Sequence, residues 1–207
     1  MIKQSTSDFY TQTLDINIIS KTRVSFFIEK IKNRSTLHYG CADWPVYNTS
    51  TNLHLSLIPH ISNIDGYDPN TETITLMKKS NMYSNTTLYD SIPDKQYDFI
   101  LVPETIEHVN NVVKLLSDIS TNAHSDTDIL ITAPNALCTE HLTRHTLKNN
   151  VWTEIVHPDH NYWFSPYTLY NSIYKGYKEL GFNTTFSEVG VIANNTMVYC
   201  IFKISKL

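Results

Sequence analysis

YDFILVPETIEHVNN, residues 97–111, changes character halfway along its length. Its first half, 97–102, is a short apolar run that is typical of a buried parallel strand. Acidic and polar residues follow at once, among them Glu104, Glu107 and His108. If this second half is helical, the three side chains lie at i, i+3 and i+4 on one face. Open α/β sheets bind ligands at the carboxyl ends of their strands, so this stretch is the first candidate for a functional site.

Length and composition indicate one domain with its own core. A chain of 207 residues that is 41% hydrophobic and 17% charged is ordinary for a globular domain. We therefore take 1–207 as a single domain, in which 1–34 forms a helical lead-in. No apolar run approaches the ~20 residues that cross a bilayer, so membrane insertion is not expected. The polar N-terminus also lacks the apolar segment of a secretion signal.

The cysteines indicate the cellular compartment, and the net charge limits the kinds of partner that are expected. Cys41, Cys138 and Cys200 have no CxxC spacing, which argues against a disulfide framework and against a cysteine zinc site. A reducing, cytoplasmic location is expected. The net charge of -4 comes with no basic cluster denser than Lys78 and Lys79, so a nucleic acid is not the expected partner.

The rest of the chain predicts strands that alternate with helices. The segments with strand character are 37–45, which ends in a glycine turn, 61–70, 86–89, 97–102, 128–135, 184–192 and 197–205. The segments with helical spacing are 24–31, 52–61, 72–79, 110–119 and 166–180. A loop rich in His and Thr is expected up to about residue 156. This order predicts an α/β fold: a Rossmann-like doubly wound sheet, mostly parallel, with a C-terminal antiparallel hairpin.

Three features carry a resemblance to a known family: the predicted order of elements, the stretch LHYGCADWP (37–45), and the acidic residues Asp68 and Glu104. On these features the chain resembles the class I S-adenosylmethionine-dependent methyltransferases over nearly its whole length. It looks most like the small enzymes that methylate sugars in capsule, lipopolysaccharide and related glycan pathways. The first loop of that family usually has the pattern hxhGxGxG, of which this chain keeps only Gly40. The retained glycine still lets the backbone approach the methionine end of the cofactor.

The resemblance implies a set of cofactor-binding residues. Gly40 and Asp43 would line the methionine end of S-adenosylmethionine, and Asp68 would bind the ribose hydroxyls. Two alternatives stay open: Asp43 could cap the next helix instead, and Asp65 competes with Asp68 as the ribose acceptor. Asp68 lies closer to the carboxyl tip of its strand. A nicotinamide cofactor is disfavoured, because GxGxxG is absent and a terminal hairpin is expected.

A second resemblance concerns a metal. ExxEH followed by HxDH, here Glu104, Glu107 and His108 and then His157 to His160, is similar to the metal site of methyltransferases that act on the 2'-hydroxyl of small-RNA 3' ends. In those enzymes two glutamates and two histidines hold a divalent cation. Glu104, Glu107 and His108 carry over directly. The fourth ligand is His157 or His160, and we favour His160 because aromatic residues follow it as they do in that family.

The chemistry of these side chains supports a cation independently. Two carboxylates on one helical turn repel each other, so either one is protonated or a cation lies between them. Two oxygen and two imidazole ligands favour Mn, Fe, Co or Zn over Mg or Ca, with Mg kept among the candidates. A bound cation would also lower the pKa of a sugar hydroxyl before it attacks a methyl sulfonium.

Simpler interpretations stand beside the metal site. Glu107 could hydrogen-bond the backbone and His108 could pack under a helix, in which case His157 or His160 becomes the general base, oriented by Asp159 or Glu104. Asp159, Tyr162 and Trp163 are candidates for a substrate wall, since aromatic faces suit sugar rings, although aromatic residues are more often core. The remaining histidines, among them His38 and His54, are expected to be structural or at the surface.

The favoured prediction is therefore an O-methyltransferase that acts on a sugar hydroxyl, in a nucleotide sugar or a glycan, with S-adenosylmethionine and a divalent metal. A terminal ribose on RNA is the alternative acceptor, which the metal motif favours and the lack of a basic cluster opposes. From another class, the chain could be a methyltransferase-like binding domain without activity, as the reduced glycine loop suggests. The presence of every candidate metal ligand argues against an inactive binding domain.

Overall fold

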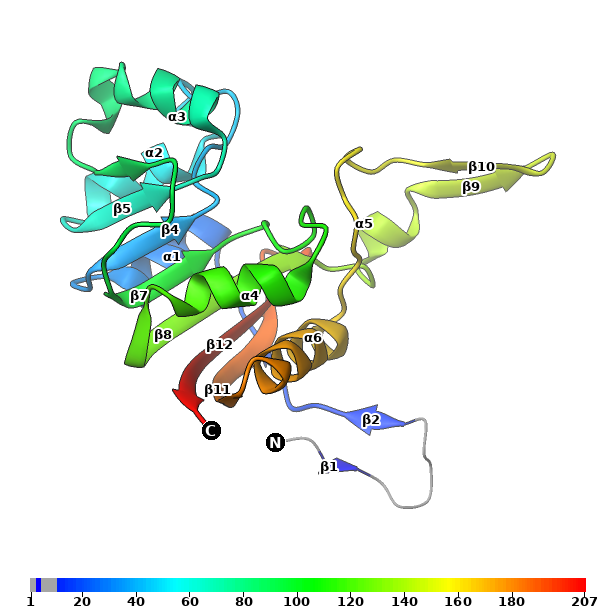
Figure 1. Cartoon of the computed structure of the whole chain (residues 1–207). Helices are drawn as coiled ribbons and strands as arrows, with labels where there is room; N and C mark the ends of the chain where they lie inside the picture. The colour runs from blue at the N-terminus through cyan, green and yellow to red at the C-terminus, as the bar shows by residue number, and fades with distance from the viewer. Residues whose placement is uncertain (1–2, 5–10) are drawn as a thin grey trace.

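A central eight-stranded sheet organises the computed structural model, which describes residues 3–4 and 11–207 (Figure 1). From one edge to the other its strands are β3 (Asn17–Ile18), β11 (Phe182–Ile192), β12 (Met197–Lys206), β8 (Ala123–Pro134), β7 (Tyr97–Val102), β4 (Thr36–Tyr39), β5 (Ile64–Tyr67) and β6 (Leu88–Tyr89). The strands from β6 to β8 are mutually parallel, whereas β12 is antiparallel to β8 and to β11. The predicted fold class, with its C-terminal antiparallel hairpin, is confirmed.

The strand order reverses between β4 and β7. From β4 the chain moves outward to β5 and β6, and then returns to place β7 on the other side of β4. A doubly wound sheet opens a crevice at such a reversal, at the carboxyl ends of the strands. The crevice therefore lies where Gly40 follows β4 and Glu104 follows β7.

Helices cover both faces of the sheet. They are α1 (Arg23–Ile31), α2 (Leu53–Leu57), α3 (Thr71–Lys78), α4 (Val112–Ser120), α5 (Thr139–Leu142) and α6 (Pro166–Glu179), with short 3-10 turns η1 (Ile58–His60) and η2 (Asn81–Tyr83). All five predicted helical segments appear, within a few residues of their expected bounds. The segment predicted as one helix over 52–61 is divided, because Pro59 has no amide hydrogen to continue α2 and lies in η1 instead.

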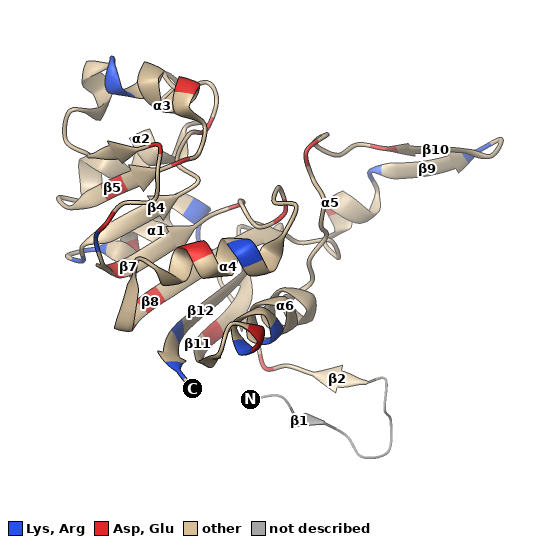
Figure 2. Ribbon diagram, viewed as in Figure 1, with Lys and Arg blue, Asp and Glu red and all other residues tan. Residues whose placement is uncertain are grey.

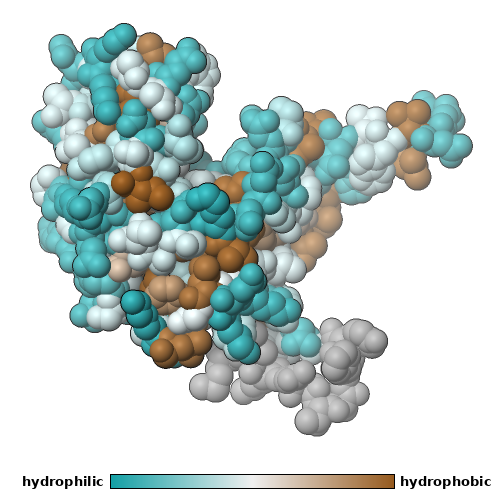
Figure 3. All heavy atoms as spheres, in the orientation of Figure 1, coloured by the Kyte–Doolittle hydropathy of each residue, from teal (hydrophilic) through white to brown (hydrophobic). Residues whose placement is uncertain are grey.

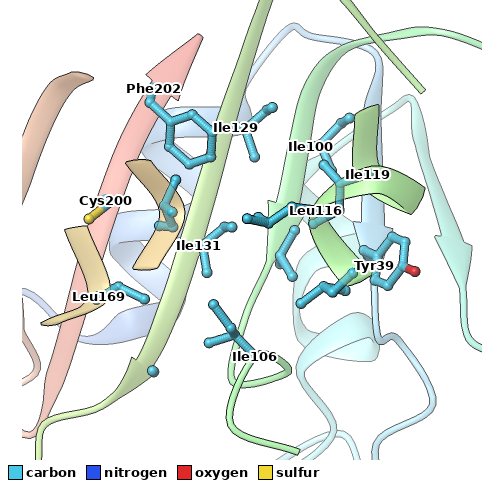
Figure 4. Packing of buried hydrophobic residues seen from close by; sticks show 14 of the residues in the cluster. Tyr39, Ile100, Ile106, Leu116, Ile119, Ile129, Ile131, Leu169, Cys200 and Phe202 are labelled. Carbon is cyan, nitrogen blue, oxygen red and sulfur yellow. The ribbon is translucent and has the colours of Figure 1, made fainter. Parts of the chain in front are cut away.

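The last four residues of β7, 99–102, are continuously apolar, whereas Asp98 near its start is exposed. Ile100 and Val102 are fully buried against α4 and α6, whereas Phe99 and Leu101 are buried on the opposite face against α1 and α2. Side chains of a strand alternate between the two faces, so a strand covered on both sides is apolar at every position. Figure 4 shows the first of these packing layers, between the sheet and its helices.

Local capping explains the ends of the clearest helices. Helix α6 begins after Ser165, whose side chain accepts from the Thr168 amide in a capping box, and Gly181 follows its C-terminus at φ +79°. Helix α4 begins at Val112, later than expected, because the Asn111 side chain accepts a hydrogen bond from the Lys114 amide and so caps the helix.

Two parts of the chain differ from expectation. The segment predicted as a long loop contains α5 and a hairpin of β9 (His145–Lys148) and β10 (Val151–Glu154), which projects from the body as an exposed arm (Figures 1 and 3). Asn149 and Asn150 both have positive φ, which a two-residue hairpin turn requires, and the sequence analysis overlooked this signal.

In the described part of the lead-in predicted over 1–34, only α1 is helical. Before it come β2 (Gln12–Thr13), which pairs with β1 (Lys3–Gln4), and β3, which adds to the edge of the sheet beside β11. The rest of residues 1–10 lies outside the described part of the chain. Within the described residues, no helix is both long and apolar enough to span a bilayer.

Candidate active site

A cleft of about 1150 Å³ opens at the reversal between β4 and β7. Its walls come from the turn after β4, the end of β5, the segment that follows β7, and a loop that includes His157 and His160. The two motifs that were predicted to form one metal site, ExxEH at 104–108 and HxDH at 157–160, therefore line the same cleft.

Gly40 ends β4 in a conformation that favours glycine. Its φ is +81°, and a Cβ added at this position would lie 2.3 Å from the Thr105 Oγ1 atom. A side chain here would be strained by the backbone and would clash with the segment after β7. The turn and that segment can approach closely only because residue 40 has no side chain.

The two acidic residues assigned to cofactor binding both line the cleft. Asp43 also accepts a hydrogen bond from the Leu53 amide at the start of α2, at 3.4 Å, so the helix-capping alternative describes a real contact. Asp68 follows β5, and its carboxylate accepts from the Ala42 amide at 3.1 Å and from the Asn70 amide at 2.9 Å. Asp68 thus ties the tip of β5 to the glycine turn.

Asp65 is occupied elsewhere. It is buried, and its carboxylate accepts hydrogen bonds from Lys95 at 2.8 Å and from the Tyr97 hydroxyl at 2.9 Å. Of the two acidic candidates on this strand, only Asp68 lines the cleft.

The helix anticipated over 103–111 does not form. Proline at 103 has no amide hydrogen, and the Glu104 amide donates to the Thr132 carbonyl of β8 at 3.1 Å instead of entering a helix. A single turn follows, closed by a 3.1 Å bond from the His108 amide to the Thr105 carbonyl. Glu104 itself has φ +44°. Glu104, Glu107 and His108 are therefore presented by a bent turn rather than by one helical face.

Glu104 and Glu107 have opposite environments within that turn. The Glu104 carboxylate is ion-paired with Arg23, the first residue of α1, which also lines the cleft. The Glu107 side chain is only 1% exposed, and neither of its carboxylate oxygens has a hydrogen-bond partner among the described residues. Burial, reinforced by the charge of Glu104, raises the pKa of Glu107 to about 8. Glu107 is thus an uncompensated buried acid at the base of the cleft.

Three histidines gather in the same cleft. His108, His157 and His160 each bring a ring nitrogen to within 4.8 Å of the others. His108 lies edge-on to His160, with ring centroids 4.6 Å apart. The Nδ1 atom of His160 is buried without a partner. Burial, followed by the neighbouring histidines, lowers the pKa of both His108 and His160. Neutral imidazoles in this arrangement are competent metal ligands.

The geometry differs in part from the predicted ligand set. The predicted set of two glutamates and two histidines becomes a cluster of three histidines, to which neither glutamate belongs. Both candidates for the fourth ligand, His157 and His160, are in the cluster.

The three residues predicted to form a substrate wall, Asp159, Tyr162 and Trp163, differ in exposure and in position. The Asp159 carboxylate is 76% exposed, lines the cleft and lies 4.0 Å from Nδ1 of His157. Trp163 is 40% exposed, with its ring edge-on to His160 at 6.0 Å. Of the three candidates only Asp159 lines the cleft, and neither Trp163 nor Tyr162 does. Tyr162 is turned to another use. Its ring packs against the core and its hydroxyl donates to the Asn110 carbonyl at 3.1 Å, so it anchors the loop.

The sequence analysis missed Arg23 and Asn161. Asn161 joins the two halves of the site through its backbone and side chain, and Arg23 holds Glu104. Neither residue belongs to a local motif. Each partnership is between segments distant in sequence, so only the fold reveals it.

Comparison with known proteins places the chain in a family. A model of the methyltransferase domain matches residues 21–175, which is most of the chain. Among curated protein sequences nothing matches it.

The solved structures share the fold at low identity. The small RNA methyltransferase HEN1 superposes with a TM-score of 0.62 at 19% identity, over 89% of this chain but only 25% of its own. The glycopeptide N-methyltransferase MtfA in complex with sinefungin gives 0.61 at 10% identity, over 95% of both chains. An S-adenosylmethionine-dependent methyltransferase from Clostridium acetobutylicum gives 0.58 at 11% identity, over 87% of this chain and 89% of its own. The family match over most of the chain shows that it belongs to the methyltransferase domain family, and the solved structures show that it has the class I methyltransferase fold.

Proposed function

We propose that the chain is an O-methyltransferase that transfers the methyl group of S-adenosylmethionine to a hydroxyl of a sugar, in a nucleotide sugar or a glycan, with a divalent cation at the cleft. The observation that carries this proposal is the unpartnered buried carboxylate of Glu107 in the same cleft as the cluster of His108, His157 and His160. A buried acid without a partner and three clustered imidazoles form a donor set that fits a cation.

Three residues would bind the cofactor. Gly40 and Asp43 line the cleft at the turn after β4, where the methionine end would lie, and Asp68 at the tip of β5 would accept from the ribose hydroxyls. Because Asp68 is also bonded to the Ala42 amide, ribose binding and the shape of the glycine turn would depend on the same carboxylate. The distance between the tips of β4 and β5 is thereby fixed before the cofactor arrives.

The cation would be held by Glu107, His108 and His160, with Glu104 joining when it leaves Arg23. When bound, such a cation supplies Lewis acidity toward an acceptor hydroxyl, which a neutral alcohol needs before it attacks a methyl sulfonium. His157, which is more exposed than His160, would then be free to take the hydroxyl proton. Asp159, which lies beside the Nδ1 atom of His157, would orient that ring.

A metal-free route uses the same residues differently. His160 or His157 would act as the general base, and Asp159 or Glu104 would hold its ring. In either route the transfer is an in-line displacement, so the residues around the cleft act mainly by positioning the acceptor against the methyl group.

The exposed face of Trp163 and the carboxylate of Asp159 would form the acceptor wall. Aromatic faces pack well against the apolar faces of sugar rings, and a carboxylate accepts from sugar hydroxyls. The only permanently charged cations that line the cleft among the described residues are Arg23 and Lys114, and each is ion-paired. This composition favours a small neutral sugar over a polyanion. A reducing compartment such as the cytoplasm fits the three cysteines, which are all free and buried.

A terminal ribose on RNA is the second candidate acceptor. It is favoured by the structural similarity to the small RNA methyltransferase HEN1 and by the resemblance of Glu104, Glu107, His108 and His160 to the metal motif of that class. Extended RNA, however, needs a basic track, and Figure 2 shows Lys and Arg scattered singly over the described chain. This chain also spans only a quarter of the HEN1 chain.

An acceptor panel tests the proposal. Radiolabelled methyl transfer is measured with nucleotide sugars, oligosaccharides and a single-stranded RNA whose 3' end carries both hydroxyls, each with EDTA or with Mn²⁺. We expect turnover of a carbohydrate with Mn²⁺ and its loss with EDTA. Salt-sensitive turnover of the RNA alone would replace the sugar by a terminal ribose, and EDTA-resistant turnover would support the histidine-base route.

A further inference from the structure

Two buried histidines come from the elements on either side of the glycine turn, β4 and α2. His38 on β4 is 1% exposed and His54 on α2 is fully buried, and their Nδ1 atoms are 2.9 Å apart. His38 precedes Gly40, the residue after β4, by two positions, and both residues line the cleft. The sequence analysis gave these histidines no functional role.

The hydrogen-bond partners of His54 fix its tautomer. Thr86 Oγ1 lies 2.6 Å from the Ile64 carbonyl oxygen and 3.1 Å from His54 Nε2. A carbonyl oxygen has no hydrogen to give, so the hydroxyl hydrogen of Thr86 points at Ile64. Thr86 must then accept from His54, whose Nε2 atom carries the ring hydrogen.

The same logic fixes His38. Burial lowers the pKa of His54 to about 4 and holds the pKa of His38 well below its ordinary value, so both rings are neutral. A neutral His54 with hydrogen on Nε2 has a bare Nδ1, and the short contact between the two rings needs one hydrogen. That hydrogen is on Nδ1 of His38. The remaining nitrogen of His38, Nε2, is consequently a bare acceptor.

The bare nitrogen has no protein donor. Among the described residues no group hydrogen-bonds Nε2 of His38, although the side chain lines the cleft. Arg23, whose charge also lowers the pKa of His38, is already paired with Glu104. An acceptor that is held in one tautomer and left open at a cleft calls for a donor from a ligand.

We propose that Nε2 of His38 accepts a hydrogen bond from the α-ammonium group of S-adenosylmethionine. This inference rests on the proposed placement of the methionine end at the glycine turn. The ammonium is the donor-rich group of that end, since it carries N–H donors and no acceptor. His54 and Thr86 are positioning residues, because they hold the acceptor tautomer of His38 without touching the cofactor.

Calorimetry with two ligands tests the contact. S-adenosylhomocysteine carries the ammonium, whereas 5'-methylthioadenosine lacks the entire amino-acid end. The variant His38→Asn keeps an amide N–H to donate to His54 but loses the acceptor at Nε2. We expect it to bind S-adenosylhomocysteine at least tenfold more weakly, as for a charge-assisted hydrogen bond, and to bind methylthioadenosine as the wild type does. The unfolding midpoint of each variant is measured alongside.

Equal losses for both ligands, or no loss for either, would overturn the contact with His38. If the wild type binds neither ligand, the proposed cofactor site is wrong and this inference falls with it. If the wild type binds S-adenosylhomocysteine and His38→Asn binds it equally well, only this inference is wrong.

Histidine tautomers give a second readout that needs no ligand. Long-range ¹H–¹⁵N spectra of the free protein should show hydrogen on Nδ1 of His38 and on Nε2 of His54. Thr86→Val removes the acceptor for His54, so it should mix these tautomers and weaken S-adenosylhomocysteine but not methylthioadenosine. Hydrogen on Nε2 of His38 in the wild type would overturn the inference even if His38→Asn does not fold.

Discussion

The backbone amide of Asn161 donates a 2.7 Å hydrogen bond to the backbone carbonyl of Glu107. The Asn161 side chain adds a 3.1 Å bond to the His108 carbonyl. These bonds hold the loop that carries His157 and His160 against the turn that carries Glu107 and His108. The two halves of the site are therefore one hydrogen-bonded unit, so a change in either half is expected to alter the other.

Asp68 should control cofactor affinity. Asp68→Ala removes the carboxylate that would accept from the ribose hydroxyls and that holds the Ala42 amide. Loss of hydrogen bonds to a charged group costs about 1.5–3 kcal/mol, so S-adenosylhomocysteine should bind roughly ten- to a hundredfold more weakly in calorimetry. The exposed Asp126→Ala is the matched control. An Asp68→Ala variant with wild-type affinity would remove the ribose role.

Two glycines with the same backbone conformation separate strain from steric clash. Gly40 and Gly181 have φ of +81° and +79°, but an added Cβ meets Thr105 at Gly40 and nothing within 4 Å at Gly181. Gly181→Ala should cost about 1–2 kcal/mol of unfolding free energy from backbone strain alone. Gly40→Ala should cost more in denaturant titrations and should also weaken S-adenosylhomocysteine. Equal costs at the two positions would contradict the close approach of Thr105.

The buried Glu107 predicts an unusual pH dependence of stability in the metal-free protein. Its pKa is about 8 in the fold and near the ordinary value of 4.5 when unfolded. The folded state therefore binds more protons between these values, and the free energy of unfolding falls as pH rises. The lowered pKa of His108 and His160 acts in the opposite direction, because their unfolded forms are still partly protonated just above pH 6.5, so the loss due to Glu107 is clearest above about pH 7.5. The expected loss from pH 6.5 to 8 is at most about 2 kcal/mol.

Glu107→Gln is the control for that titration. The amide cannot ionise, so the variant should lose less stability than the wild type over the same pH range in thermal unfolding. Parallel pH profiles for the two proteins would show that Glu107 is not an uncompensated buried acid.

The pairing of Arg23 with Glu104 should compete with a cation. Arg23→Gln frees the Glu104 carboxylate, and we expect it to bind Mn²⁺ several-fold more tightly than the wild type in calorimetry. Arg34→Gln provides the control, because Arg34 pairs with Asp128 on another part of the sheet. An unchanged or weaker Mn²⁺ affinity in Arg23→Gln would exclude Glu104 from the ligand set.

Much of the fold is predictable from local pattern, whereas the site is predictable only in part. The apolar run of β7, Gly181 after α6 and the closing hairpin follow from periodicity and turn chemistry, and all three appear as expected. The helix predicted after β7 does not form, because Glu104 has positive φ and donates its amide hydrogen to β8, which outweighs the helical spacing.

The partnerships that join distant segments could not be predicted. Arg23 with Glu104 is one such pair, and the relay from Thr86 to His38 is another. Each depends on the tertiary approach of elements whose local sequence gives no indication of the partner. The residues of the two motifs could be identified from the sequence. The residues that fix their positions through contacts could not.

The central claim is a cation site at the histidine cluster, and Mn²⁺ calorimetry on the metal-free protein tests it most directly. We predict one Mn²⁺ per chain, no binding in His160→Ala, and wild-type binding in His124→Ala, which changes a histidine away from the cleft. The absence of Mn²⁺ binding in the wild type, or equal binding in His160→Ala, would contradict the claim.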